Sequence, residues 1–177
     1  MGCISKLNRA ILVDCDAGAT GIEELLLINY SEIAAKDIAA GQGNLTFYNG
    51  VGAAILVESN KKGVNASSEV RVNDNAPAAL ADSVTFTIYG KDETSADIVN
   101  RILNGRFVAV AKMKEKNIYR VYGLVYGLNM SAYTEEANAN GGFTTITLST
   151  PENVIGEQRA NFNPKTYTTL RTGAIVA

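Results

Sequence analysis

Four short runs of β-branched and aromatic residues follow one another closely in the second half of the chain. They are Phe107–Met113, Ile118–Tyr122, Leu124–Tyr133 and Phe143–Thr150. Turn-forming residues separate them, with the last gap closed by Asn140-Gly-Gly. Short apolar runs bounded by turn residues are typical of antiparallel strands. The pattern therefore predicts a meander of antiparallel strands between residues 106 and 150.

Residues 53–74 have the pattern of a long hairpin arm. Its two strands are Ala53–Ser59 and Val64–Asn73, and its tip is the turn Asn60, Lys61, Lys62 and Gly63. In the second strand, small or apolar side chains alternate with polar ones, as in a half-buried strand. A ribbon with such a weakly apolar inner face is marginal by itself. We therefore expect either an inter-subunit contact through the tip or a simple edge hairpin.

One segment changes from strand-like alternation to helical spacing. Thr94-Ser-Ala-Asp97 has the form of a capping box, and Ile98, Val99, Ile102 and Leu103 follow at helical spacing. Asn104-Gly105 provides a C-terminal stop. The spacing predicts a helix over residues 94–105, with its apolar stripe lying across the sheet or barrel.

Two N-terminal segments have less distinct patterns. Ile22–Tyr30 is compatible with strand or helix, but its length and the flanking Gly21 and Ser31 favour a buried strand. The Ala-rich residues 31–40 favour a turn of helix.

Two segments that contain proline residues show still less strand or helix periodicity. A loop is expected over residues 74–82, which contain Pro77, before a strand at Ser83–Tyr89. Residues 157–177 are expected to be a C-terminal extension, in which Tyr167–Leu170 forms a short strand or part of an arm.

Length and composition narrow the fold class. A chain of 177 residues fits a single domain, residues 1–177. Its low charged fraction of 19% suits a chain that hides more than one face, and a net charge of −2 gives no basic field for nucleic acid. The expected fold is an antiparallel β-sandwich or barrel with one flanking helix. No run approaches the roughly 18 apolar residues of a transmembrane helix, and no leader is recognised, so we expect a soluble protein without a membrane partner.

The sequence offers little catalytic chemistry. It has no histidine, which removes the usual general base and the commonest metal ligand. The spacing of Cys3 and Cys15 does not suit a metal site, and reduced thiols are favoured over a disulfide. An acidic group of Asp14, Asp16, Glu23 and Glu24 lacks the spacing of a calcium loop. We therefore predict no enzyme, no metal and no cofactor.

Two further groups of side chains have alternative interpretations. Glu135 and Glu136 are adjacent on a polar loop and so do not have the opposed geometry of paired-acid catalysis; a solvated or lumen-facing patch is favoured. Four tyrosines lie at strand positions beside basic residues: Tyr119, Tyr122, Tyr126 and Tyr133. They could stack on single-stranded nucleic acid, although cross-strand packing is favoured.

The order of these segments resembles a known family. Tyr119-Arg-Val-Tyr-Gly123-Leu-Val-Tyr-Gly127-Leu128, then a polar loop, then Gly141-Gly-Phe-Thr-Thr-Ile-Thr-Leu148 and Glu152 resembles the C-terminal half of tail tube proteins of long-tailed bacteriophages. Within that family it resembles the tail tube proteins of phages of the Bacteroidetes group. The upstream hairpin, strand and helix stand in the family's order, and the resemblance covers about residues 60–152.

The resemblance implies a structural subunit of the virion that assembles in the bacterial host cytoplasm. Copies would form stacked, hexameric rings and then a tube that conducts DNA without binding it specifically. The implied partners are the chain itself and other tail proteins: the terminator, the tape measure and, where one is present, a sheath. A lumen that passes a polyanion should lack basic clusters, and inward-facing Glu135 and Glu136 would suit it.

Two alternatives remain open at the level of sequence. One is another virion component, such as a capsid decoration protein, tail terminator or minor tail protein. The other is a small β-barrel module that binds carbohydrate or single-stranded nucleic acid through the tyrosine-bearing strands.

Overall fold

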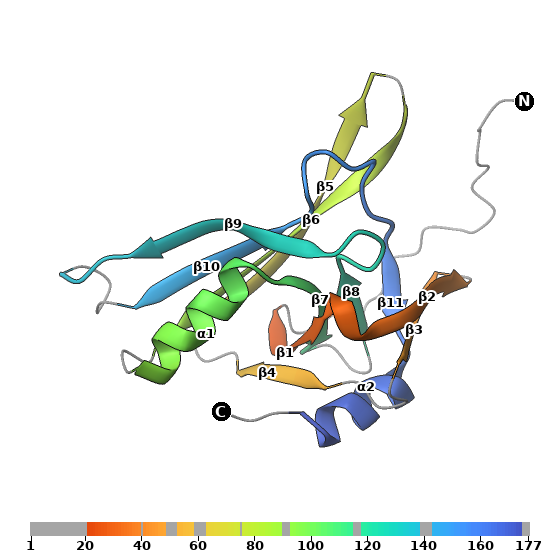
Figure 1. Cartoon of the computed structure of the whole chain (residues 1–177). Coiled ribbons are helices and arrows are strands. Elements are labelled where there is room, and N and C mark those ends of the chain that lie inside the picture. Colours follow the sequence, from red (N-terminus) through yellow and green to blue (C-terminus); the bar gives the residue numbers. More distant parts are fainter. Residues whose placement is uncertain are drawn as a thin grey trace, which may run out of the picture.

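A computed structural model describes residues 21–39, 41–48, 53–58, 63–74, 76–89, 93–114, 118–138 and 143–174. In this part of the chain, eleven strands form one open, mixed sheet flanked by two α-helices (Figure 1). The fold is therefore mainly β, as predicted, but the sheet does not close into a barrel. The elements in chain order are β1 (Ile22–Asn29), η1 (Tyr30–Glu32), β2 (Ile33–Ala39), β3 (Gln42–Phe47), β4 (Ala54–Glu58), β5 (Val64–Asn73), β6 (Ala76–Ile88), α1 (Glu93–Leu103), β7 (Arg106–Met113), β8 (Tyr119–Tyr122), β9 (Leu128–Glu135), β10 (Thr144–Ser149), β11 (Ala160–Phe162) and α2 (Pro164–Thr172).

The sheet branches at β7. One edge of β7 pairs with β1, which pairs in turn with β4. The other edge of β7 pairs with β9 near its start and with β8 farther along. The β9 branch continues through β10 and β6 to β5, and the β8 branch continues through β11 and β3 to β2. The two branches thus diverge between β8 and β9, at residues 123–127.

The central pair β1–β7 is buried on both faces. Leu25 and Leu27 pack with β5, β6, β10 and α1 in one hydrophobic cluster. Leu26 and Ile28 pack with β3, β11 and α2 in a second cluster on the opposite face. A strand that is buried on both sides has a continuous apolar sequence instead of an alternating one. The prediction of a buried strand at residues 22–30 is confirmed.

Helix α1 lies between β6 and β7, and helix α2 follows β11. The predicted helix over 94–105 is observed as α1, whose Ile102 is buried in the first cluster. The second helix, α2, occupies the segment expected to be a short strand or an arm. Asn163 caps it by accepting a hydrogen bond from the Lys165 N–H at 2.9 Å, and Gly173 follows its end. Its Tyr167 and Leu170 lie at helical spacing and pack into the second cluster.

The predicted hairpin arm at residues 53–74 is wrong in its pairing. Its first strand, β4, pairs with β1, where Leu56 lies opposite Leu26. Its second strand, β5, pairs with β6 in a hairpin that extends from residue 64 to residue 88. The reason is burial: the apolar side chains of β4 complete both clusters beside β1, which the weakly apolar β5 could not do. Residues 76–82, expected to be a loop, belong to β6.

Three smaller expectations also differ from the structure. Residues 33–39 form β2 instead of a turn of helix. The meander is interrupted, because β9 pairs with β7 and β10 but not with β8. Residues 124–127, expected at the start of a strand, form the turn between the two branches.

Two hairpins extend beyond the rest of the sheet. Figure 1 shows β5–β6 projecting at the top and β9–β10 projecting at the left, in different directions. β10 pairs with β6 only as far as Ser83, so the outer half of the β5–β6 hairpin is a two-stranded ribbon. We call residues 68–73 of β5 and 76–81 of β6 the arm.

Candidate functional site

Two glycines shape the turn at which the sheet branches. Gly123 and Gly127 both have positive φ, 71° and 76°, a backbone conformation that glycine adopts without strain. The Gly127 N–H donates to the Gly123 carbonyl at 2.9 Å, and Leu124 between them is buried in the second cluster. A Cβ on Gly123 would lie 2.5 Å from Leu128. The spacing Gly123-Leu…Gly127-Leu128 thus has a structural role in the turn.

Two buried carboxylates hold this turn against the arm. Glu157 accepts hydrogen bonds from the N–H groups of Val125 at 2.6 Å and Tyr126 at 2.7 Å, and its backbone exchanges two hydrogen bonds with Leu80. Asp82 accepts from the Gly123 N–H at 2.9 Å. Burial raises the pKa of both carboxyl groups, although the backbone N–H donors partly offset the effect.

The carbonyl side of the turn is also occupied. The Val125 oxygen accepts from the Tyr30 hydroxyl at 2.6 Å and from the Lys36 ammonium. Lys36 lies 4.0 Å from the centre of the Tyr30 ring, and the Arg106 guanidinium lies 5.4 Å from it. The polar groups around the turn therefore have partners within the fold. Their arrangement braces the branch point and contains no pair of nucleophile and base.

The arm presents apolar side chains to solvent. Val70 is 67% exposed and Val72 is 80% exposed, and no described strand pairs with the outer edge of β5. The arm is nevertheless fixed near its outer end, because Arg71 donates to the carbonyl oxygens of Pro151 at 2.8 Å and Val154 at 3.2 Å. The arm is thus a braced ribbon with an open edge and exposed valines.

A second exposed group of aromatic residues lies at the opposite end of the same strands. Tyr89, which follows β6, and Phe143, which precedes β10, are in edge-to-face contact with ring centres 4.8 Å apart. Tyr133 of β9 is also partly exposed. Exposed aromatic residues that cluster at one end of a sheet are typical of contact surfaces.

The predicted site residues fall partly in this second region. Asn60, Lys61 and Lys62 lie outside the described residues. Gly63 is not at a hairpin tip: its carbonyl accepts from the Thr87 N–H at 3.0 Å, so it begins the pairing of β5 with β6. Glu135 ends β9, is exposed and accepts a hydrogen bond from the Tyr133 hydroxyl, and Glu136 is exposed beside it.

The register places Gly63 and Glu135 at the same end of the sheet. Glu135 lies opposite Thr144, and Thr144 lies opposite Ile88. Ile88 directly follows Thr87, the residue that donates to the Gly63 carbonyl. Three strand spacings separate β9 from β5, roughly 14 Å. The predicted residues therefore share one end of the β9–β10–β6–β5 branch without being in contact by register.

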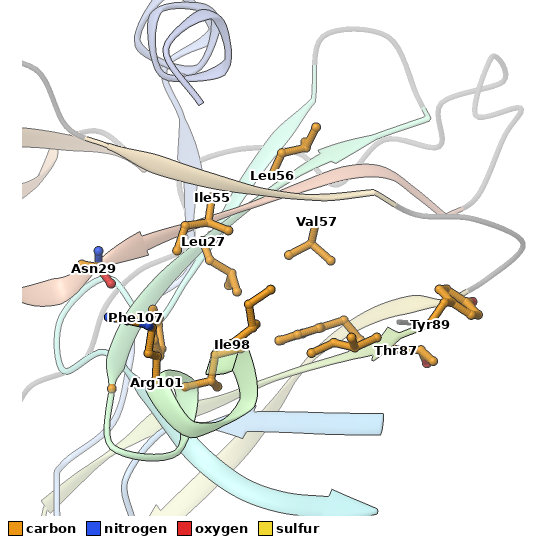
Figure 2. Close-up of a pocket in the computed structure, with 14 residues that line it drawn as sticks. Leu27, Asn29, Ile55, Leu56, Val57, Thr87, Tyr89, Ile98, Arg101 and Phe107 are labelled. Carbon is orange, nitrogen blue, oxygen red and sulfur yellow. The ribbon is translucent and has the colours of Figure 1, made fainter. Parts of the chain in front are cut away.

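An apolar groove of about 690 Å³ lies between α1 and β4. Figure 2 shows Ile55 and Val57 of β4 directed toward Ile98 of α1, with Leu27 at the floor. Asn29 and Arg101 contribute polar groups at its margin. A groove of this character suits an apolar side chain or an extended apolar segment.

The four tyrosines of the sequence do not share an exposed face. Tyr122 is buried in the first cluster, whereas Tyr119 packs on Tyr167 with ring centres 4.5 Å apart. Tyr133 is exposed on β9, in the other branch of the sheet. This distribution disfavours a shared stacking platform, and the ring that Tyr119 contacts lies on a helix instead of a neighbouring strand.

The remaining candidate groups take part in ion pairs or lie outside the description. Glu23 pairs with Lys112 at 3.0 Å, and Glu24 pairs with Arg171 at 3.1 Å. The hydrogen bond from Arg171 lowers the pKa of Glu24. Cys3, Cys15, Asp14 and Asp16 are not among the described residues. In the part of the chain that is described, no group of three or more potential metal ligands comes together, and no helix is long and apolar enough to cross a bilayer.

Comparisons with known proteins identify no relative of this chain. The chain matches no protein-family model, and searches of curated proteins and of solved structures found no similar protein.

Proposed function

We propose that this protein is a virion structural subunit that polymerises into stacked rings and forms a phage tail tube. The observation that carries the proposal is the arm: a ten-residue edge strand, β5, with an open outer edge and exposed Val70 and Val72. An exposed, apolar edge strand is a template for pairing with another chain. In a protein that assembles, the same edge is satisfied by a neighbouring copy.

The way the arm is held also supports assembly. Arg71 ties the arm to the loop after β10, and Asp82 and Glu157 tie its base to the turn at the branch point. A ribbon whose direction is fixed before association loses less conformational freedom when a neighbour binds. The two hairpins project in different directions (Figure 1), so one subunit presents two separate surfaces to its neighbours. Different surfaces on the same subunit form head-to-tail contacts, which close into rings when the rotation allows it.

The proposed role in conducting DNA rests on charge. Glu135 and Glu136 are exposed at the end of β9, and the whole chain carries a net charge of −2. A channel lined by carboxylates repels the phosphate backbone and lets DNA pass without holding it. The proposed partners are further copies of the chain and the other tail proteins, namely the terminator, the tape measure and a sheath where one is present. No enzymatic step is part of this function.

The test is the assembly of the purified full-length chain. Negative-stain microscopy at high protein concentration, with and without the other tail proteins, should show rings or tubes with a central hole. A double substitution, Val70→Asp with Val72→Asp, should abolish them because it places charges at the unpaired edge. Leu103→Asp is the matched control, since Leu103 is also exposed but lies on α1.

The outcomes separate the proposal from its rivals. A wild-type chain that remains a monomer under all these conditions contradicts assembly. Rings that persist in the double variant would move the contact away from the arm. Particles that decorate capsids or close the tail end would instead assign the protein to another part of the virion.

A further inference from the structure

A smaller, polar cavity lies where the base of the arm passes β8 and β11. Its volume is about 180 Å³, and its polar lining residues are Ser67, Ser68, Asp82, Arg120, Tyr122 and Arg159. The serines and Asp82 come from the β5–β6 hairpin, whereas Arg120 and Tyr122 come from β8 and Arg159 directly precedes β11. Because one molecule of water occupies about 30 Å³ in the liquid, the cavity has room for a small oxyanion and some water.

One arginine donor at this cavity has no acceptor within the described residues. Arg120 and Tyr122 alternate along β8 and so share one face of the strand. The Arg120 side chain hydrogen-bonds to the Tyr122 hydroxyl, but its Nε–H is buried without an acceptor. A guanidinium has five N–H donors and no acceptor. A buried donor without a partner in a native fold indicates a missing water or ion.

The one carboxylate that lines the cavity is already engaged. One oxygen of Asp82 accepts from the Ser68 hydroxyl at 2.5 Å, and the other accepts from the Gly123 N–H at 2.9 Å. No ion pair to Arg120 or Arg159 is found within the described residues. The cavity is thus lined by two arginines and one carboxylate, and that carboxylate accepts hydrogen bonds from Ser68 and Gly123. The lining therefore carries a net positive charge.

We propose that this cavity binds a small tetrahedral oxyanion of the phosphate or sulfate type, held by Arg120 and Arg159 with Ser67 at its wall. Guanidinium groups bind such anions through paired N–H donors at fixed geometry. The site joins the arm to β8 and β11, so an occupied site links the two branches of the sheet. It is a property of the single subunit and does not depend on the proposed assembly.

The direct test is a titration of the full-length protein with sodium sulfate against sodium chloride at equal ionic strength, followed by calorimetry and by backbone amide shifts. Saturable sulfate binding should shift the amide signals of Ser67, Ser68 and Gly123. Arg120→Gln and Arg159→Gln should each weaken binding roughly tenfold, since each removes charge-assisted hydrogen bonds. Arg101→Gln is the matched control, because Arg101 is exposed on α1 and pairs with Asp97.

The control is needed because sulfate also stabilises folded proteins without binding to a site. Equal sulfate affinity in the wild type and both cavity variants would overturn the proposal, as would shifts spread over the surface with no saturation. Arg159 is exposed, so Arg159→Gln should remain folded even if Arg120→Gln does not. The result is therefore decisive in either case.

Asp82 provides a second, independent readout. Sulfate stays fully ionised at neutral and mildly acidic pH, so a change in its affinity there reports on the protein. Ser68 and the Gly123 N–H donate to Asp82, the side chains of Tyr122, Arg120 and Arg159 line the same cavity, and the Glu157 carboxyl is close enough to interact with it. Burial raises the pKa of Asp82, and protonation on acidification removes the charge that opposes the anion. Sulfate should therefore bind more tightly as the pH falls, and Asp82→Asn should bind tightly at neutral pH. A weaker affinity in that variant would contradict the site.

Discussion

The central pair β1–β7 and the β5–β6 arm are both built from aliphatic side chains on strands, but they differ in what covers them. The central pair has a hydrophobic cluster on each face and a paired strand on each edge. Within the described residues, the arm pairs with no strand other than its own two, and it is held only by Arg71 and by the hydrogen bonds between Leu80 and Glu157. Identical residue types thus provide stability in one region and a free surface in the other. The surroundings of a residue decide its role.

The largest expected effect tests that difference directly. Leu26→Ala should lower the free energy of unfolding by about 3 kcal/mol, because it leaves a cavity in a fully buried site. Val72→Ala should change it by less than about 0.5 kcal/mol, because Val72 is mostly exposed. Denaturant unfolding at a concentration where the protein is monomeric gives both values. A loss in Val72→Ala as large as in Leu26→Ala would mean that the arm is packed against something in the single subunit.

The next effect concerns the turn between β8 and β9, to which Asp82 and Glu157 are hydrogen-bonded. Gly123→Ala should cost roughly 2–4 kcal/mol, because alanine is strained at positive φ and its Cβ would lie 2.5 Å from Leu128. Gly41→Ala is a matched control: its φ of 78° is similar, but no atom lies within 4 Å of the added Cβ. The control should cost only about 1 kcal/mol. Thermal unfolding of the two variants separates backbone strain from crowding, and equal losses would show that crowding at Leu128 is relieved by a shift.

The same two regions show what the sequence could predict. The strand at 22–29 was predictable because residues 25–28 form a continuous apolar run, a pattern that indicates burial on both faces. In the arm, alternation identified β5 as a strand but not its partner, since β4 and β6 both flank it along the chain. Pairing depended on tertiary burial of β4 beside β1, which no local pattern records.

The residues that brace the turn were missed for a related reason. Asp82 lies in a segment expected to be a loop and Glu157 begins the expected C-terminal extension, yet they accept hydrogen bonds from N–H groups 31 to 41 residues away. No local signal indicates such a distant partner. The helix α2, in contrast, had signals in the sequence: Asn163 before it, Pro164 at its first position and Gly173 after it. The threonine residues within it weakened the helical pattern.

The third effect tests how the arm is joined to the turn. Glu157→Gln should lower the free energy of unfolding by about 1–3 kcal/mol, because a glutamine side chain cannot accept from both the Val125 and Tyr126 N–H groups.

Burial raises the pKa of Glu157, so the native state binds its proton more tightly than the unfolded state. The stability that this proton provides is fully present below the ordinary pKa and is lost as the pH rises through the raised pKa. The difference between wild type and variant should therefore be largest at acidic pH and shrink toward neutrality. A difference that grows with pH would show that burial does not dominate. Glu152→Gln, which changes an exposed glutamate, should show no such trend.

The smallest effect concerns Glu24, beside the buried central pair. Its pH dependence should be opposite to that of Glu157. Arg171 lowers the pKa of Glu24, the neighbour of Leu25 on β1, and Tyr167 donates a further hydrogen bond to it. A lowered pKa means that the carboxylate's contribution is present above the ordinary value and is lost as the pH falls through the lowered one. Because the pair is partly exposed, Glu24→Gln should cost less than about 1 kcal/mol at neutral pH. The cost should disappear on acidification.

Measuring both glutamine variants over the same pH series sharpens the comparison, since the two differences must change in opposite directions. Parallel curves would show that the charged pair on β1 and the buried acid at the arm experience the same surroundings, contrary to the structure.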